Sequence, residues 1–202
     1  MRESGAITIG HRESSIPFSF LSARGEPIGY SIFVSGTKLL VKKGSAIRSL
    51  RDLGGTRVVV TAGTTNEKAM RDLAAKFRIA MDLRVAADHA ASFAMLAAGE
   101  ADAFATDDVL LHGLLAQNKA QADDVVVGDF LSYDPYGVML RKGDPQLARL
   151  VDDTFRQLAE DREIERRYNR WFLRRLPSGV SLDLPMSAQL DTIIQTMAAR
   201  TE

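Results

Sequence analysis

The chain has 202 residues, of which 46% are hydrophobic and 26% are charged, the composition of an ordinary globular protein. Lys plus Arg and Asp plus Glu both total 26, so no net field attracts nucleic acid or an anionic membrane, and a charged ligand must be recognised locally. The absence of cysteine excludes a disulfide framework, a thiolate metal site and a cysteine nucleophile. Residues 1–5 provide no apolar core of the length of a secretory signal, and no later run approaches a membrane span.

The predicted elements begin with a short strand at 6–10 and a longer one at 32–41, which Ser35-Gly36 interrupts. From residue 45 the pattern becomes regular, with a short helix at 49–53, a strand at 57–61 and a helix that opens after Gly63-Thr64-Thr65 and runs to about 77. Two more strand–helix pairs follow at 83–86 with 89–98 and at 101–106 with 109–116, then strands at 125–127 and 136–140 and helices at 145–160, 162–173 and 188–199. This alternation predicts an α/β fold with a largely parallel sheet, whose ligands bind beyond the carboxyl ends of the strands.

The first candidate site is the turn that joins the strand at 57–61 to its helix. Free N–H groups at a helix start, with the hydroxyls of Thr64 and Thr65, form a receptor for a carboxylate or phosphate. The alternative is that one of these threonines is only an N-cap, which is common at helix starts.

Arg12 follows the strand at 6–10 and is the second candidate. A guanidinium at that position can pair with a ligand carboxylate in a two-pronged geometry that a lysine does not reproduce. The alternative is an exposed arginine that pairs with Glu13 or with nothing.

His89 and Asp107 follow two further strand ends. A carboxylate there can pair with a ligand ammonium group, and a histidine can donate to an anion. The alternative makes Asp88 and Asp107 helix caps. Matched polar groups after three strands favour a binding rim over three unrelated caps.

Catalytic motifs are weak in this sequence. No serine stands in a nucleophile elbow, the three histidines lack metal-ligand spacing, and no glycine-rich phosphate loop is present, so we expect no catalytic residue, no metal and no cofactor. His112 is expected on an exposed helix face, and Trp171 is expected to pack its helix.

Seven ordered blocks carry a resemblance to a known family. They read GHRESSIPFS at 10–19, PIGYS at 27–31, GTKLLVKKG at 36–44, TAGTT at 61–65, DH with SF at 88–93, DD at 107–108 and YGVMLRK at 136–142. With these blocks and the helix around Trp171, nearly all of the chain resembles the glutamate/aspartate-binding proteins of bacterial polar amino acid ABC importers.

The resemblance implies a type II periplasmic-binding-protein-like fold, with two α/β lobes that close on an amino acid and a periplasmic location. It implies that Arg12 meets a ligand carboxylate, that Thr64 and Thr65 bind another, that His89 adds a donor and that Asp107 takes the α-ammonium group. The partners implied are glutamate or aspartate and the importer's membrane permease, and the receptor itself performs no chemistry.

The sequence departs from the family between Ser31 and Ile32, where several α/β units of the first lobe are missing. We therefore expect a truncated first lobe, formed by 1–45 and 130–202, and a complete second lobe at 46–129. Apolar surface meant for the missing helices would be exposed or covered again, and homo-oligomerisation is one remedy.

Two alternatives to a solute receptor remain at this point. A dehydratase-like enzyme on the same fold would need a positioned acid and base, for which His89 and the pair Asp107 and Asp108 are available. A stripped lobe could instead act as a folding or interaction module without any ligand.

Overall fold

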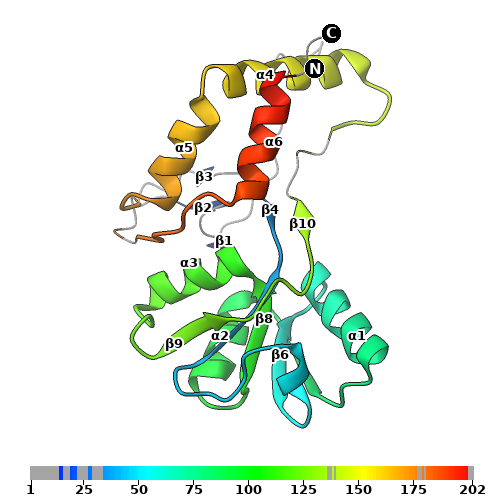
Figure 1. The fold of residues 1–202 in the computed structure, drawn as a ribbon, viewed down its shortest axis with the longest axis vertical. Coiled ribbons are helices and arrows are strands. Elements are labelled where there is room, and N and C mark those ends of the chain that lie inside the picture. The colour runs from blue at the N-terminus through cyan, green and yellow to red at the C-terminus, as the bar shows by residue number, and fades with distance from the viewer. Residues whose placement is uncertain are drawn as a thin grey trace.

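The structure is a computed structural model that describes residues 14–15, 19–21, 27–28, 34–135, 138, 140–176, 179 and 181–199. The predicted strand at 6–10 and Arg12 lie outside the described residues. Two parts are visible, one built around a five-stranded sheet and one built from the last three helices (Figure 1). The short strands β4 (Val34–Ser35) and β10 (Asp134–Pro135) pair antiparallel and connect the two parts. We call β4 and β10 the connecting strands.

The five-stranded sheet has the order β7-β6-β8-β5-β9. Its strands are β5 (Thr37–Lys42), β6 (Arg57–Thr61), β7 (Asp82–Ala86), β8 (Ala103–Asp107) and β9 (Asp124–Val127). Strand β6 pairs parallel with both β7 and β8, whereas β5 runs antiparallel to β8 and β9. The predicted α/β class is therefore confirmed, as is the predicted parallel arrangement of the three strands that precede the candidate site.

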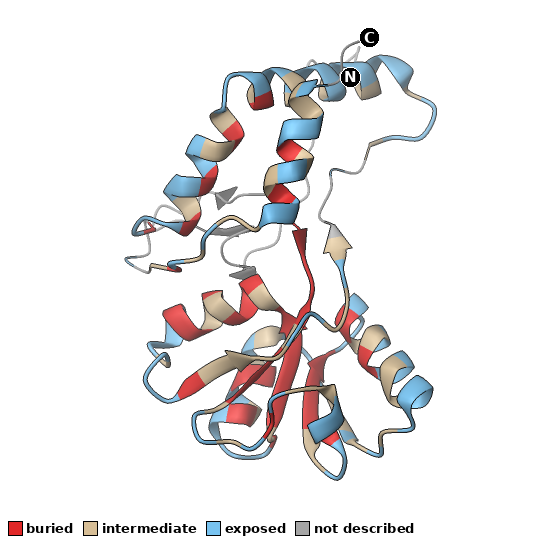
Figure 2. Ribbon diagram, viewed as in Figure 1, coloured by how far each residue is buried: buried red, intermediate tan, exposed pale blue. Residues whose placement is uncertain are grey.

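Successive residues of the central strands face opposite sides of the sheet, as the pleat requires. In β6, Val58 and Val60 belong to one core with Met70, and Val59 belongs to the other core with Phe93. Helix α1 (Thr65–Phe77) and the 3₁₀ helix η1 (Leu50–Leu53) cover the first face, and α2 (His89–Ala97) and α3 (Asp108–Asn118) cover the second. Figure 2 shows the central strands as the most continuously buried part of the molecule.

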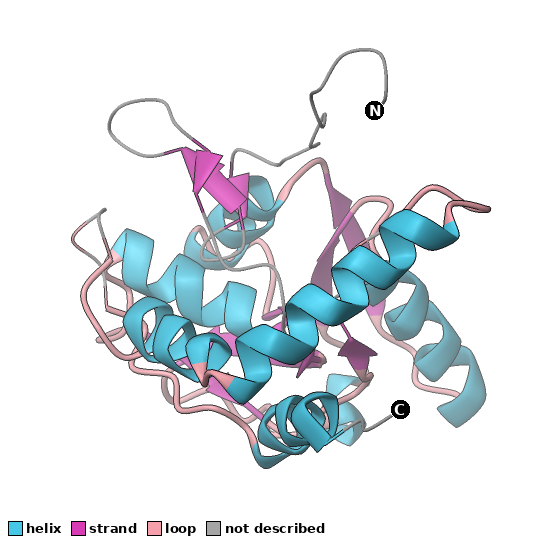
Figure 3. Ribbon diagram, turned by 90° about the horizontal axis from the view of Figure 1, so that it is seen from above, coloured by secondary structure: helices cyan, strands magenta, loops and turns pink. Residues whose placement is uncertain are grey.

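The second part consists of α4 (Pro145–Glu160), α5 (Glu163–Phe172) and α6 (Ala188–Ala199). These helices lie above the sheet-containing part in Figure 1 and in front of it in Figure 3, where the molecule is seen from above. Tyr168 and Phe172 of α5 are fully buried and stack with ring centroids 4.2 Å apart. Their core also takes in Val109 and Leu110 of α3, so one apolar cluster joins the two parts. Near the N-terminus, β1 (Ser14–Ser15), β2 (Ser19–Leu21) and β3 (Pro27–Ile28) form a small antiparallel sheet.

Two predictions differ from the structure. In the predicted strand at 136–140, the described residues Val138 and Leu140 belong to no strand, because the pairing with β4 occurs earlier, at Asp134 and Pro135. His112 is half-buried rather than on an exposed face. Strand β5 pairs within the five-stranded sheet, and the division of the chain into two lobes at residue 45 stays a prediction.

Candidate functional site

The carboxyl ends of β7, β6 and β8 meet at one edge of the sheet, which we call the rim. Because β6 lies between β7 and β8, the segment that follows β6 is flanked by the segments that follow its two neighbours. Thr64 and Thr65 follow β6, His89 follows β7, and Asp107 ends β8. Arg12 is the one predicted site residue that lies outside the described part of the chain.

Thr64 is the N-cap of α1. Its Oγ1 accepts the N–H of Glu67 at 3.1 Å and donates to the carbonyl of Thr61 at 2.8 Å, so the capping alternative describes this side chain well. Thr65 occupies the first helical position and is exposed. The N–H groups of the first helical residues have no intrahelical acceptor, so the start of α1 still presents donors at the rim.

A carboxylate of the chain already uses this part of the rim. The N–H of Gly63 donates to Glu67 Oε2 at 2.9 Å, and this bond, with a further contribution from Arg71, lowers the pKa of Glu67. Gly63 can turn here because its φ is +68°, a conformation that favours glycine. The start of α1 therefore stabilises negative charge, as its dipole and free N–H groups predict.

His89 is held through its ring nitrogen by a pair of hydroxyl groups. Its Nδ1 lies 2.8 Å from Thr61 Oγ1, which lies 2.9 Å from Ser92 Oγ. Ser92 has a single hydroxyl hydrogen and donates it to the carbonyl of Asp88 at 3.0 Å. All three contacts are satisfied only if Thr61 donates to Ser92 and His89 Nδ1–H donates to Thr61, which assigns the hydrogen of the neutral ring to Nδ1.

Asp107 is almost completely buried, with 5% of its surface exposed. Its Oδ1 accepts a hydrogen bond of 2.8 Å from Nδ2 of Asn66, the second residue of α1. It stands at the N-cap position of α3 but makes no side-chain capping bond, whereas the next residue, Asp108, accepts from the N–H of Val109 at 2.8 Å. The capping alternative therefore does not account for Asp107.

The side chains that join the rim were not predicted as site residues. Thr61 and Ser92 tie β6 to the start of α2, and Asn66 ties the start of α1 to the end of β8. A signal for Asn66 exists in the sequence, because it directly follows Thr64 and Thr65 and an amide in a helix's first turn sits close to the strand end. Its partners come from distant parts of the chain and leave no local pattern.

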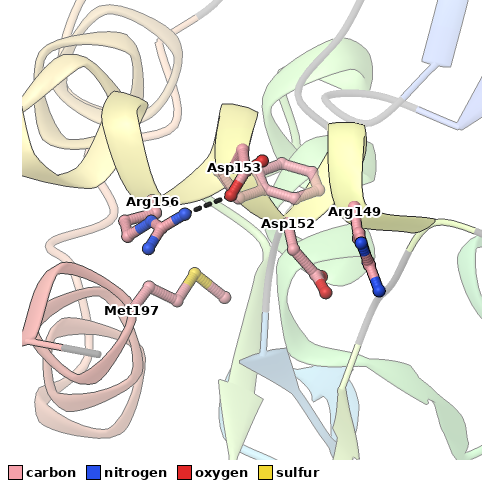
Figure 4. A pocket seen from close by; sticks show the side chains of 6 residues that line it. Arg149, Asp152, Asp153, Arg156 and Met197 are labelled. Carbon is pink, nitrogen blue, oxygen red and sulfur yellow. Dashed lines mark hydrogen bonds and ion pairs between the residues drawn. The ribbon is translucent and has the colours of Figure 1, made fainter. Parts of the chain in front are cut away.

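A hollow lies between α4 and α6, away from the rim (Figure 4). It has a volume of about 340 Å³ and is lined by Arg149, Asp152, Asp153, Phe155, Arg156 and Met197. Asp153 and Arg156 form an ion pair across one turn of α4. Two acidic and two basic side chains balance here, so the hollow has no charge preference. Among the described residues, no cluster of three metal-ligating side chains occurs, and no helix is long and apolar enough to cross a membrane.

Comparison with known proteins gives close relatives over almost the whole chain. The L-glutamate/L-aspartate-binding protein of Pseudomonas aeruginosa is 33% identical over 259 residues, which cover 96% of this chain and 86% of the relative. The glutamate/aspartate import solute-binding protein of Escherichia coli is 30% identical over 257 residues, which cover 96% of this chain and 85% of the relative. No family model matches the chain.

The fold is also that of known solved structures. The ancestral amino acid-binding protein AncCDT-1, a precursor of cyclohexadienyl dehydratase, superposes with a TM-score of 0.65 at 24% identity, over 79% of this chain and 92% of that one. This likeness confirms the predicted binding-protein-like fold.

The length of the alignment bears on the predicted deletion. A match of 259 positions cannot be filled by a chain of 202 residues, so at least 57 positions of the Pseudomonas relative have no counterpart here. The place of the gap, predicted between Ser31 and Ile32, lies outside the described residues.

Proposed function

Because the chain belongs to the family of glutamate/aspartate-binding solute-binding proteins, we propose that it captures an acidic amino acid at the rim for an ABC importer. The observation that carries this proposal is the meeting of three chemically different groups at one sheet edge. They are the anion-stabilising start of α1, the imidazole of His89 and the buried carboxylate of Asp107.

The ligand's α-carboxylate fits the start of α1. The helix dipole and the N–H groups of the first turn favour an anion there, and the hydroxyl of Thr65 is exposed beside them. Thr64 contributes chiefly by fixing the turn, because its hydroxyl is used for capping. The bond from Gly63 to Glu67 supports this assignment, since it shows the same turn holding a carboxylate.

The α-ammonium group fits Asp107. A buried carboxylate gains most from a cation that replaces the water it has lost, and Asp107 lies one strand away from the start of α1. Because the Nδ1–H of His89 is donated to Thr61, His89 meets the side-chain carboxylate through Nε2, which carries a hydrogen only in the imidazolium form that a neighbouring carboxylate favours. Arg12 is proposed to join it from the first lobe. This arrangement favours a second negative charge and so favours glutamate or aspartate over glutamine.

We further propose that the chain is a receptor without chemistry of its own, that it works in the periplasm and that its partner is a membrane permease. The related proteins are named for binding and import, which supports this reading over a dehydratase. The proposed lobes are the sheet-containing part, from about Gly36 to residue 129, and the remainder of the chain.

The proposal is tested by following backbone amide shifts in nuclear magnetic resonance spectra during titration with glutamate, aspartate and glutamine. Glutamate and aspartate should change the chemical shifts of the backbone amides at the rim, and glutamine should bind more weakly. Asp107→Asn should lose most of the affinity for glutamate, because it removes the charge that meets the ammonium group. Asp153→Asn on α4 is the matched control and should bind as the wild type does. Equal affinity for glutamate and glutamine, or a wild-type response in Asp107→Asn, would contradict the proposal.

A further inference from the structure

Asn66 sits between the rim and the connecting strands. Its side chain is buried, with 3% of the residue exposed, and both hydrogens of its amide are used. One is donated to Asp107 Oδ1 and the other to Thr37 Oγ1, each at 2.8 Å. Thr106 Oγ1 donates to the amide oxygen at 3.3 Å, which fixes which side of the amide faces Asp107.

The chain of hydrogen bonds continues from Thr37 to the connecting strands. Thr37 Oγ1 lies 2.7 Å from Ser132 Oγ, which donates to Asp134 Oδ2 at 2.6 Å. Ser132 donates its only hydroxyl hydrogen to Asp134, so Thr37 must be the donor to Ser132. Every bond therefore points away from Asn66 toward Asp134, a residue of β10.

The position of Asn66 needs a side chain that donates two hydrogen bonds. Both ends of the network are carboxylates, Asp107 and Asp134, and these accept hydrogen bonds when ionised. A side chain between them has to donate in two directions at once, which an amide NH₂ does and a hydroxyl with one hydrogen does not.

A second link joins the same two regions. Ser35 of β4 is buried and donates to Asp108 Oδ1 at 2.6 Å, and the N–H of Asp108 donates to the carbonyl of Gly36 at 3.0 Å. The two adjacent carboxylates at the end of β8 are thus each connected to the connecting strands, Asp107 through Asn66 and Asp108 through Ser35.

We propose that Asn66 is a positioning residue that holds the Asp107 carboxylate toward the ligand's ammonium group and keeps it in register with the connecting strands. This inference rests on the proposed function for the ligand, but the network itself is a property of the chain without ligand. A shift of β10 against β4 would pass through Ser132 and Thr37 to the amide and so to Asp107, because packed hydrogen-bonded groups move together.

The binding test compares Asn66→Ala with Asn118→Ala, a matched control on the exposed end of α3, where the Asn118 side chain donates to the carbonyl of Leu114. Amide shifts are titrated with glutamate and with glutarate, which has both carboxylates but no ammonium group. Loss of Asn66 should weaken glutamate binding about tenfold or more, as for one lost hydrogen bond to a charged group, and should change glutarate binding less than about twofold. Asn118→Ala should change neither. An equal loss for both ligands would show a merely structural role and overturn the proposal.

A second test needs no ligand. Urea unfolding midpoints are measured for Asn66→Ala, Ser132→Ala and the double variant, with Asn66→Ala and Ser92→Ala as the control pair, because Ser92 belongs to the separate hydroxyl pair at Thr61. The double variant of Asn66 and Ser132 should have a urea midpoint close to that of the less stable single variant. For the control pair, the two single-variant shifts in midpoint should add. Additive shifts in the urea midpoint for Asn66→Ala and Ser132→Ala would show that the two residues are not coupled and would overturn the proposal. If wild-type protein shows no response to glutamate, the proposed function fails, and this cycle alone decides the role of Asn66.

Discussion

At the scale of single residues, the hydroxyl of Thr61 decides how His89 is held. It receives the Nδ1–H of His89 and gives its own hydrogen to Ser92, so one oxygen satisfies two neighbouring groups. Thr61 is 5% exposed and Ser92 is fully buried, so water cannot replace the lost hydroxyl easily.

Replacing this hydroxyl gives the first prediction. Thr61→Val keeps the shape of the side chain but leaves His89 Nδ1–H and Ser92 Oγ without their partner, and it should lower the free energy of unfolding by about 1–3 kcal/mol. Thr61→Ser keeps the hydroxyl and should lose less than half as much. Urea denaturation of the three proteins measures the difference. Similar stability of the valine variant and the wild type would show that this hydroxyl does not contribute to the free energy of unfolding.

His112 gives a prediction about pH. Burial lowers the pKa of this imidazole below its ordinary value of 6.5, and Lys38 lowers it further, whereas Asp108 raises it. Because the folded pKa is below the unfolded pKa, the unfolded chain takes up a proton first as the pH falls. His112 therefore costs nothing well above pH 6.5 and reduces stability as the pH falls through and below that value.

The measurement compares wild type with His112→Gln between pH 8 and pH 5. Denaturation midpoints of the wild type should fall more steeply with decreasing pH than those of the variant, since all other titrating groups are shared and cancel in the difference. Curves that stay parallel over this range would contradict the burial of His112.

At the scale of elements, Gly36 lets β4 pass into β5 where the chain crosses the segment before β10. A Cβ at this position would lie 2.0 Å from the carbonyl oxygen of Ser132 and 2.7 Å from the ring of Phe130. The first neighbour is backbone and cannot rotate away, so a methyl group has to push the crossing apart.

Gly36→Ala should therefore lower the free energy of unfolding by about 1–3 kcal/mol or more, the usual cost of overpacking. Gly54→Ala is the matched control, because a Cβ there meets nothing within 4 Å and the backbone has an ordinary φ of −60°. Thermal unfolding of both variants decides the matter. Equal thermal stability of the two alanine variants would contradict the close approach of Ser132 and Phe130 to Gly36.

The same scale shows what sequence patterns can and cannot reveal. The strand at Arg57–Thr61 and the helices at Pro145–Glu160 and Ala188–Ala199 were predicted with their exact bounds, because apolar spacing and caps are local signals. The strand expected at 136–140 was wrong at its described residues, since pairing with β4 depends on where the two connecting strands meet. The rim followed from strand order alone, whereas the Asn66 network required knowing that residues 37, 66, 107 and 132 meet in space.

At the scale of the whole molecule, the part that carries α4 is thinly covered. This helix of 16 residues buries only Ala159, and Leu150 on its surface is 57% exposed. The alignment with the Pseudomonas relative contains at least 57 positions that this chain cannot supply. An exposed apolar helix face is a site of self-association, so we expect the sedimentation coefficient to rise with protein concentration. A sedimentation coefficient that stays constant with concentration would contradict self-association through α4.

The proposed shortening of the first lobe also determines the affinity that we expect. A closed two-lobe receptor surrounds its ligand and excludes water, which strengthens each charged contact. With most first-lobe contacts gone, the ligand would be bound mainly from the rim side, by the start of α1, His89 and Asp107. Ion pairs that remain open to solvent contribute only about 0–1 kcal/mol each, and association costs an estimated 4 kcal/mol or more.

We therefore predict that a monomer of this chain binds glutamate with a dissociation constant no better than roughly 1 mM, equivalent to about −4 kcal/mol. Calorimetric titration at a protein concentration where sedimentation shows a monomer measures this value, and the same titration at a concentration where the chain associates shows whether a second copy completes the site. A low-micromolar constant for the monomer would contradict the prediction, because the rim alone would then hold the ligand without the enclosure that a second lobe provides.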